Sequence, residues 1–142
     1  VYVVHTGSPD FLGCDFIGNR AIGYLLGASG AAMYVSADDG GDFCRVEHCR
    51  FLGNFSDQSG GAVTNICQDG TFLNCLFAHN VSTVYGGGAI NNSGACGSNP
   101  TIANCTFAYN ISISNSVGAG IYNFRSAPTL SNCIFWGNAR NG

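Results

Sequence analysis

Three observations predict that the sequence folds as an all-β protein, a right-handed parallel β-helix (β-solenoid) of about five coils. A motif, C-x-F-x-x-N, occurs five times, with its cysteines spaced by 35, 26, 30 and 28 positions. A Gly-rich motif follows each of the first four copies and begins at Gly30, Gly60, Gly87 and Gly118. Both motifs are short, β-branched or aromatic, and bounded by Gly and Asn, which favours strands over helices. Internal repeats with a period of about 20–50 residues indicate solenoids, propellers or arrays.

The C-x-F-x-x-N copies predict three core ladders, in which like residues lie above one another in successive coils. Cys and Phe alternate with a variable residue, so both can point inward. Stacked Phe rings would fill the core, and Asn side chains would hydrogen-bond along the stack to satisfy the turns. The ladders are Cys14, Cys49, Cys75, Cys105 and Cys133; Phe16, Phe51, Phe77, Phe107 and Phe135; and Asn19, Asn54, Asn80, Asn110 and Asn138.

A bend is expected directly before each ladder cysteine. The apolar residue three positions before each cysteine has the wrong parity for one straight strand that carries both. Asn precedes the cysteine in three copies and Gly13 in the first, and both residue types tolerate the left-handed αL conformation. His48, in the second copy, is a less common occupant. Each coil is therefore expected to contain a strand, this bend, a second strand, a turn that holds the ladder Asn, a loop, and a third strand at the Gly-rich motif.

The coil is expected to be right-handed, because parallel crossover connections almost always are. A β-propeller is the alternative architecture, but one blade needs about four strands in about 40–45 residues. Residues 1–142 are expected to form a single β-solenoid domain with partial coils at both ends. The first four residues align with the third-strand position of a coil, and the chain stops four residues after Asn138.

The repeats resemble those of the polymorphic outer membrane proteins. The resemblance rests on G-G-A-I, literal at Gly87 to Ile90, and on F-x-x-N, which is present five times. It covers about residues 11–138 and implies a β-helix fold. It also implies surface display and adhesion, through long passenger domains attached to a membrane-barrel translocator.

The amino-acid composition limits the classes of binding partner and the cellular compartments that are expected for this protein. Charged residues make up 9% of the chain, lysine is absent, and the net charge of −3 argues against a nucleic-acid partner. No apolar run approaches the roughly 20 residues of a membrane span. Eight cysteines favour an oxidising compartment, so we expect an extracellular or cell-surface location.

The sequence offers no catalytic constellation, so we expect no enzyme and no cofactor. The outward residues between Cys and Phe form no row of one chemical type; they are Asp15, Arg50, Leu76, Thr106 and Ile134. The histidines lie at different repeat positions; they are His5, His48 and His79. The Gly-rich loop with Asp38, Asp39 and Asp42 is a candidate calcium site, with a solvated surface turn as the alternative.

Two covalent features are expected. Cys67 lies eight residues before one ladder cysteine, and Cys96 nine residues before the next, so a Cys67–Cys96 disulfide is predicted. Cys44 would stay free or pair across molecules. Glycosylation needs an exposed sequon Asn. Since the ladder and the bend already account for the other sequon asparagines (Asn54, Asn80, Asn104 and Asn110), Asn91 is the glycosylation candidate.

The two ends of the chain predict head-to-tail assembly. The C-terminus carries the first part of a coil and the N-terminus the rest, so two copies would complete one coil between them. All eight acidic residues, Asp10 and Asp15 among them, lie within residues 1–70. The charged residues within residues 71–142 are Arg125 and Arg140. An open contact of this kind gives filaments. The expected interface residues are Val1, Tyr2, Val3, Val4, Asn138 and Arg140.

The expected function is a non-enzymatic structural or adhesive β-solenoid outside the cell that assembles into filaments. Its partner would be a second copy of itself, and cell-surface glycans are a further candidate. The alternatives are a carbohydrate-binding or carbohydrate-cleaving β-helix protein, or a fragment of a longer surface adhesin. A carbohydrate groove requires aligned aromatic side chains and carboxylates on an exposed face, and the sequence shows no such row.

Overall fold

A computed structural model describes residues 1–4, 8–23, 29–37, 44–94, 96–113 and 118–140. The candidate calcium residues Asp38, Asp39 and Asp42, and also His5, lie outside the described residues. In the described part of the chain every regular element is a short strand, and no helix is present that could cross a membrane.

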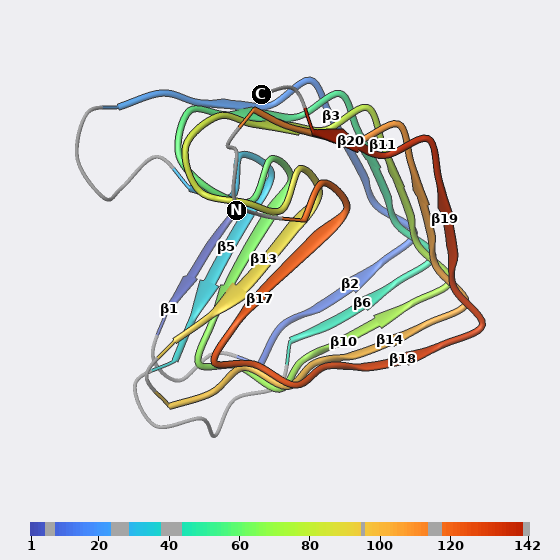
Figure 1. Ribbon diagram of the computed structural model, residues 1–142. Coiled ribbons are helices and arrows are strands. Elements are labelled where there is room, and N and C mark those ends of the chain that lie inside the picture. The colour runs from blue at the N-terminus through green and yellow to red at the C-terminus, as the bar shows by residue number, and fades with distance from the viewer. Residues whose placement is uncertain (5–7, 24–28, 38–43, 95, 114–117, 141–142) are drawn as a thin grey trace.

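The strands form four parallel sheets of five strands each (Figure 1). Each of the strands β1 to β16 pairs with the strand four places further along the chain, as in β1 with β5 and β2 with β6. Sheet A contains β1 (Tyr2–Val4), β5 (Met33–Ser36), β9 (Val63–Ile66), β13 (Ile90–Ser93) and β17 (Ile121–Phe124). Sheet B contains β2 (Asp10–Leu12), β6 (Arg45–Glu47), β10 (Thr71–Leu73), β14 (Thr101–Ala103) and β18 (Thr129–Ser131). Sheet C contains β3 (Asp15–Ile17), β7 (Arg50–Leu52), β11 (Leu76–Ala78), β15 (Thr106–Ala108) and β19 (Ile134–Trp136). Sheet D contains β4 (Arg20–Ala21), β8 (Phe55–Ser56), β12 (Val81–Ser82), β16 (Ile111–Ser112) and β20 (Ala139–Arg140).

The parallel β-helix predicted from the sequence is therefore confirmed, with two corrections. Five strands per sheet give four intervals, so the chain makes about four turns rather than five coils. Each coil has four strands rather than three, because a two-residue strand of sheet D follows the ladder Asn. This strand has no apolar alternation of its own, which is why the sequence pattern did not reveal it.

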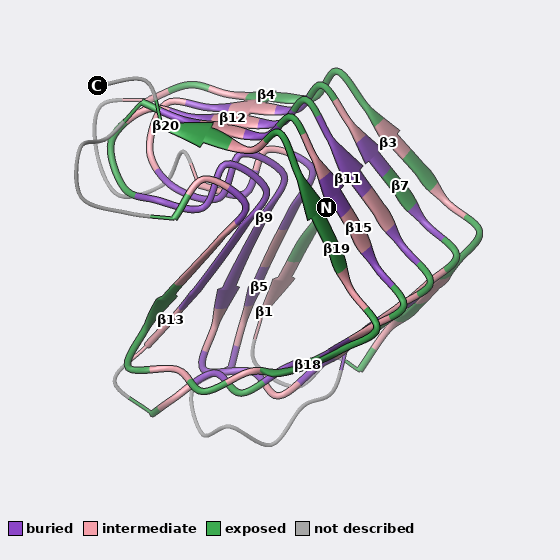
Figure 2. Cartoon of the chain, turned by 45° about the vertical axis from the view of Figure 1, so that its right-hand side comes forward, coloured by how far each residue is buried: buried purple, intermediate pink, exposed green. Residues whose placement is uncertain are grey.

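The phenylalanine ladder forms the spine of the core. Rings of successive coils stack with centroids 4.6–4.8 Å apart and planes within 7° of parallel. The rings of Phe51, Phe77 and Phe107 are fully buried, whereas Phe135 in the last coil is 47% exposed. Figure 2 shows the same trend for whole strands: β9 and β11 of the middle coils are largely buried, and β19 and β20 are exposed.

Two left-handed bends turn the chain in each coil. The predicted bend before the ladder cysteine is confirmed, with φ between 49° and 62° at Gly13, His48, Asn74, Asn104 and Asn132. A second bend precedes the ladder Asn, with φ between 54° and 64°, and the residues there are Gly18, Gly53, His79, Tyr109 and Gly137. The two bends separate sheet B from sheet C and sheet C from sheet D.

The Asn ladder closes the second bend with a repeated set of hydrogen bonds. Asn80 Nδ2 donates to Phe51 O at 2.9 Å and to Asn110 Oδ1 at 2.9 Å. Asn54 and Asn110 make the corresponding bonds, and all three side chains are fully buried. The ladder thus pairs backbone groups that would otherwise be buried without partners.

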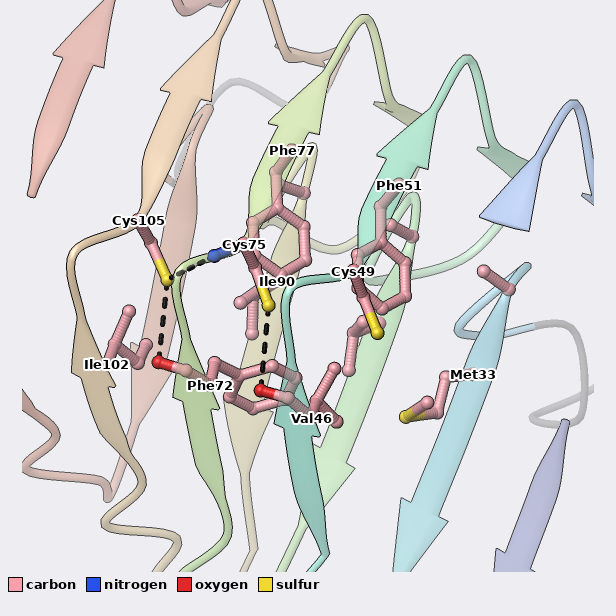
Figure 3. Close-up of a cluster of buried hydrophobic side chains, with 14 of the residues drawn as sticks. Met33, Val46, Cys49, Phe51, Phe72, Cys75, Phe77, Ile90, Ile102 and Cys105 are labelled. Atoms are coloured by element: carbon pink, nitrogen blue, oxygen red, sulfur yellow. Dashed lines mark hydrogen bonds between the residues drawn. The ribbon is translucent and has the colours of Figure 1, made fainter. Parts of the chain in front are cut away.

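The cysteine ladder repeats this arrangement at the first bend with a weaker donor. Cys75 Sγ lies 3.5 Å from Val46 O and Cys105 Sγ 3.4 Å from Phe72 O (Figure 3). In both ladders the acceptor is three residues before the ladder residue of the preceding coil. These cysteines are free thiols, so they act as small buried groups and also as weak hydrogen-bond donors.

The Gly-rich motif lets neighbouring coils approach closely. The first glycine has a positive φ at Gly30, Gly60 and Gly87. The second glycine has no room for a side chain, because a Cβ on Gly88 would lie 2.3 Å from Ala119 O. The backbone just before each of these sheet A strands therefore packs directly against the backbone of the next coil.

Candidate functional site

The candidate site is a groove on the outer face of sheet A. Strand alternation turns Ile90 and Asn92, which are both fully buried, toward the interior. Asn91 and Ser93 of β13 therefore lie on the outer face, beside Tyr122 and Phe124 of β17. Together with Ser59 and Tyr85 from the preceding loops, these four residues line a groove of about 420 Å³.

The polar part of the groove belongs to a hydrogen-bonded chain of four side chains, three of which line the groove. Asn91 Nδ2 donates to Ser59 Oγ at 3.4 Å and to Ser93 Oγ at 3.3 Å. Ser59 Oγ in turn lies 3.1 Å from Ser29 Oγ. Only 5% of Asn91 is exposed, so this amide is held in one orientation by its neighbours.

Aromatic side chains form the apolar part of the groove. Tyr85 is 59% exposed and Phe124 50% exposed, although rings of this size normally lie in the core. The Arg125 guanidinium packs on the Phe124 ring, 5.4 Å from its centroid. The six residues that line the groove are three aromatic residues, two serines and one asparagine.

Asn91, the glycosylation candidate predicted from the sequence, is not an exposed residue. Glycosylation requires an exposed Asn, but the side chain of Asn91 is buried in the hydrogen-bond network of the groove. The sequon asparagine that lies exposed is Asn104. It occupies the αL bend, and this backbone role already accounts for an Asn at that position. Asn54, Asn80 and Asn110 are fully buried in the ladder, as expected for core residues.

The structure joins Cys67 and Cys96 in a disulfide, with their Cα atoms 5.3 Å apart. The bond links Cys67, which directly follows β9, to Cys96, which lies three residues after the end of β13 in the adjacent coil. Cys44 remains a buried free thiol, and burial raises its pKa from 9.0 to about 12. Among the described residues no group of three His, Cys, Asp or Glu side chains is placed to hold a metal ion.

The expected interface residues lie on two end faces. The N-terminal end face consists of β1–β4 and the C-terminal end face of β17–β20; within the described chain each of these strands pairs on one side only. Val1 and Tyr2 are 54% and 73% exposed at the first face. At the same face Asp15, which the charge argument assigned to contact between copies, accepts hydrogen bonds from Arg50 of the next coil, and this contact lowers its pKa.

The fold and its ladders define the class of this protein as a parallel β-helix. The chain matches no protein-family model, no curated protein and no solved structure. The resemblance of its repeats to those of the polymorphic outer membrane proteins therefore rests on the motifs alone.

Proposed function

We propose that the chain is an extracellular, non-enzymatic structural or adhesive β-solenoid that assembles head to tail with copies of itself. The observation that supports this proposal is the half-completed Asn ladder at each end face. Between coils, each ladder Oδ1 accepts two hydrogen bonds from the Asn before it; Asn54 Oδ1, for example, accepts from Asn19 N and Nδ2 at 3.0 and 2.8 Å. At the C-terminal end face, the two groups of Asn138 that would donate to a following ladder Asn, N and Nδ2, have no such acceptor among the described residues. At the N-terminal end face, Asn19 Oδ1 has no preceding ladder Asn from which to accept.

Stacking would extend every sheet in register. Strands β1–β4 of one copy would lie on β17–β20 of the next, and Phe16 would stack on Phe135. The contact would pair unsatisfied strand edges and cover the half-exposed Phe135 ring, both of which are liabilities when left open. With five strands per sheet and about 4.8 Å between strands, each copy would add roughly 24 Å to a filament.

The covalent chemistry supports the proposed compartment. The Cys67–Cys96 disulfide is typical of proteins that fold in an oxidising environment, which supports an extracellular or cell-surface location. The alternative is that the chain is a fragment of a longer surface adhesin. In that case further coils of the same type would stack on the same two end faces.

The experiment compares two substitutions on one strand, β19. Phe135→Glu places a charge in the core seam of the C-terminal end face, whereas Trp136→Glu places the same charge on the outer surface, where Trp136 is 66% exposed. Light scattering after size-exclusion chromatography, over a concentration series, should show assembly of the parent chain and of Trp136→Glu. Phe135→Glu should remain monomeric, because an unpaired charge would be buried in the contact.

Circular dichroism controls for folding, since both variants should keep the strand signal of the parent chain. Deletion of residues 1–4 should likewise prevent assembly while the remaining coils stay folded. The proposal fails if the parent chain is monomeric at its highest soluble concentration, or if folded Phe135→Glu assembles as well as the parent.

A further inference from the structure

We infer that the groove on the outer face of sheet A binds a neutral saccharide. The inference rests on the six lining residues and does not require head-to-tail assembly, although Tyr122 and Phe124 lie on β17 at the edge of the C-terminal end face. A sugar ring offers an apolar C–H face to an aromatic ring and an edge of hydroxyl groups to amides and hydroxyls. The groove combines both kinds of partner, with three aromatic rings from Tyr85, Tyr122 and Phe124 beside the Ser59–Asn91–Ser93 cluster.

The polar cluster presents an acceptor and a donor side by side. Both hydrogens of the Asn91 amide are used within the protein, on Ser59 and Ser93, so Asn91 Oδ1 is left to accept. Ser93 Oγ accepts one of these hydrogens, so its own hydroxyl hydrogen is left to donate. An acceptor next to a donor is complementary to neighbouring sugar hydroxyls, each of which can donate and accept.

The shape and charge of the groove favour a neutral ligand of modest size. A volume of about 420 Å³ lies at the lower part of the range of about 300–1,000 Å³ for small-molecule sites, which suits one or two sugar rings. None of the lining residues carries a formal charge at neutral pH. Arg125 packs on the ring of Phe124, but it is not one of the residues that line the groove.

The test uses an array of immobilised neutral and uronic-acid oligosaccharides, followed by calorimetric titration with the neutral oligosaccharide that gives the strongest signal. Tyr85→Ala should weaken its affinity about five- to tenfold, because an exposed loop ring is removed. Ser93→Ala should weaken it about two- to fivefold through the lost hydroxyl donor. Both positions lie outside the core, so the variants should fold.

Two matched controls should leave the affinity unchanged within about twofold. Tyr109→Asn removes a comparably exposed tyrosine outside the groove, at a positive φ that Asn tolerates. Arg125→Gln removes the nearby cation. The inference is overturned if no neutral oligosaccharide binds, if Tyr85→Ala binds as well as the parent chain, or if binding is confined to uronic acids and disappears in Arg125→Gln. The assembly-deficient Phe135→Glu variant keeps the groove and should still bind, so failure of assembly and failure of binding are distinguishable.

Discussion

At the scale of single residues, the fold depends on ten left-handed backbone positions, one on each side of every strand of sheet C. Asn, Gly, His and Tyr occupy them, and each is followed directly by a ladder Cys or Asn. From the second copy of the motif onward, the side chain of this Cys or Asn bonds to the preceding coil. Since a left-handed residue with a Cβ is strained, the ladder bonds and the stacked rings offset that cost. The bends and ladders therefore act as one unit.

Asn104→Ala is expected to destabilise the chain by about 1 kcal/mol, because Ala fits the left-handed conformation at φ 55° less well than Asn. The Asn104 side chain is exposed, so little packing is lost. Urea denaturation measures the difference, with Asn104→Gly as the matched control that should retain the stability of the parent chain. A neutral Asn104→Ala would show that this backbone position carries no strain.

The buried Cys44 thiol is expected to make stability fall at alkaline pH. Its pKa is raised by burial from 9.0 to about 12, so the unfolded chain releases this proton more readily than the folded chain does. The stabilising contribution is complete below about pH 9 and is lost as the pH rises toward 12. Urea denaturation at pH 8 and pH 10 should show a smaller loss in Cys44→Ser than in the parent chain. Equal losses would contradict the assignment.

At the scale of elements, the Gly-rich motif brings the backbones of neighbouring coils into close contact, because a Cβ on Gly61 or Gly88 would meet backbone oxygens of the next coil. The sequence showed the Gly-rich motif, the stacked Phe residues and the first bend, because these recur at fixed offsets. It did not show the sheet D strands, which are two residues long and lack alternation. Nor did it show the groove, whose Tyr85 and Ser59 come from loops of different sequence, so no repeated pattern placed them beside β13 and β17.

Gly88→Ala is expected to cost about 1–3 kcal/mol or more, because its Cβ would meet the backbone oxygens of Ala119 and Ile111 at 2.3 and 2.6 Å. Ala119 occupies the equivalent position in the next coil, and Ala119→Gly is therefore the control, with a change of no more than about 1 kcal/mol. Thermal denaturation followed by circular dichroism compares the two. Similar melting temperatures for Gly88→Ala and the parent chain would contradict the close approach of the two coils.

At the scale of the whole molecule, the proposed assembly uses the end faces and the proposed saccharide binding uses the lateral surface, and the two surfaces share strand β17. The ladders run through every coil, and at each end face they leave donors or acceptors that a further coil could satisfy. The groove lies on the side of the solenoid, where stacking at the ends does not consume its polar cluster. Head-to-tail growth would therefore display one groove per copy along a filament.

Electron cryomicroscopy of the purified chain at high concentration tests this account most directly. Continued stacking in register predicts unbranched filaments, a repeat of about 4.8 Å between strands, and an axial rise of roughly 24 Å per copy. It also predicts that Phe135→Glu gives only single particles. Isolated particles of the parent chain, or filaments whose rise per copy is incompatible with five stacked strands, would contradict it.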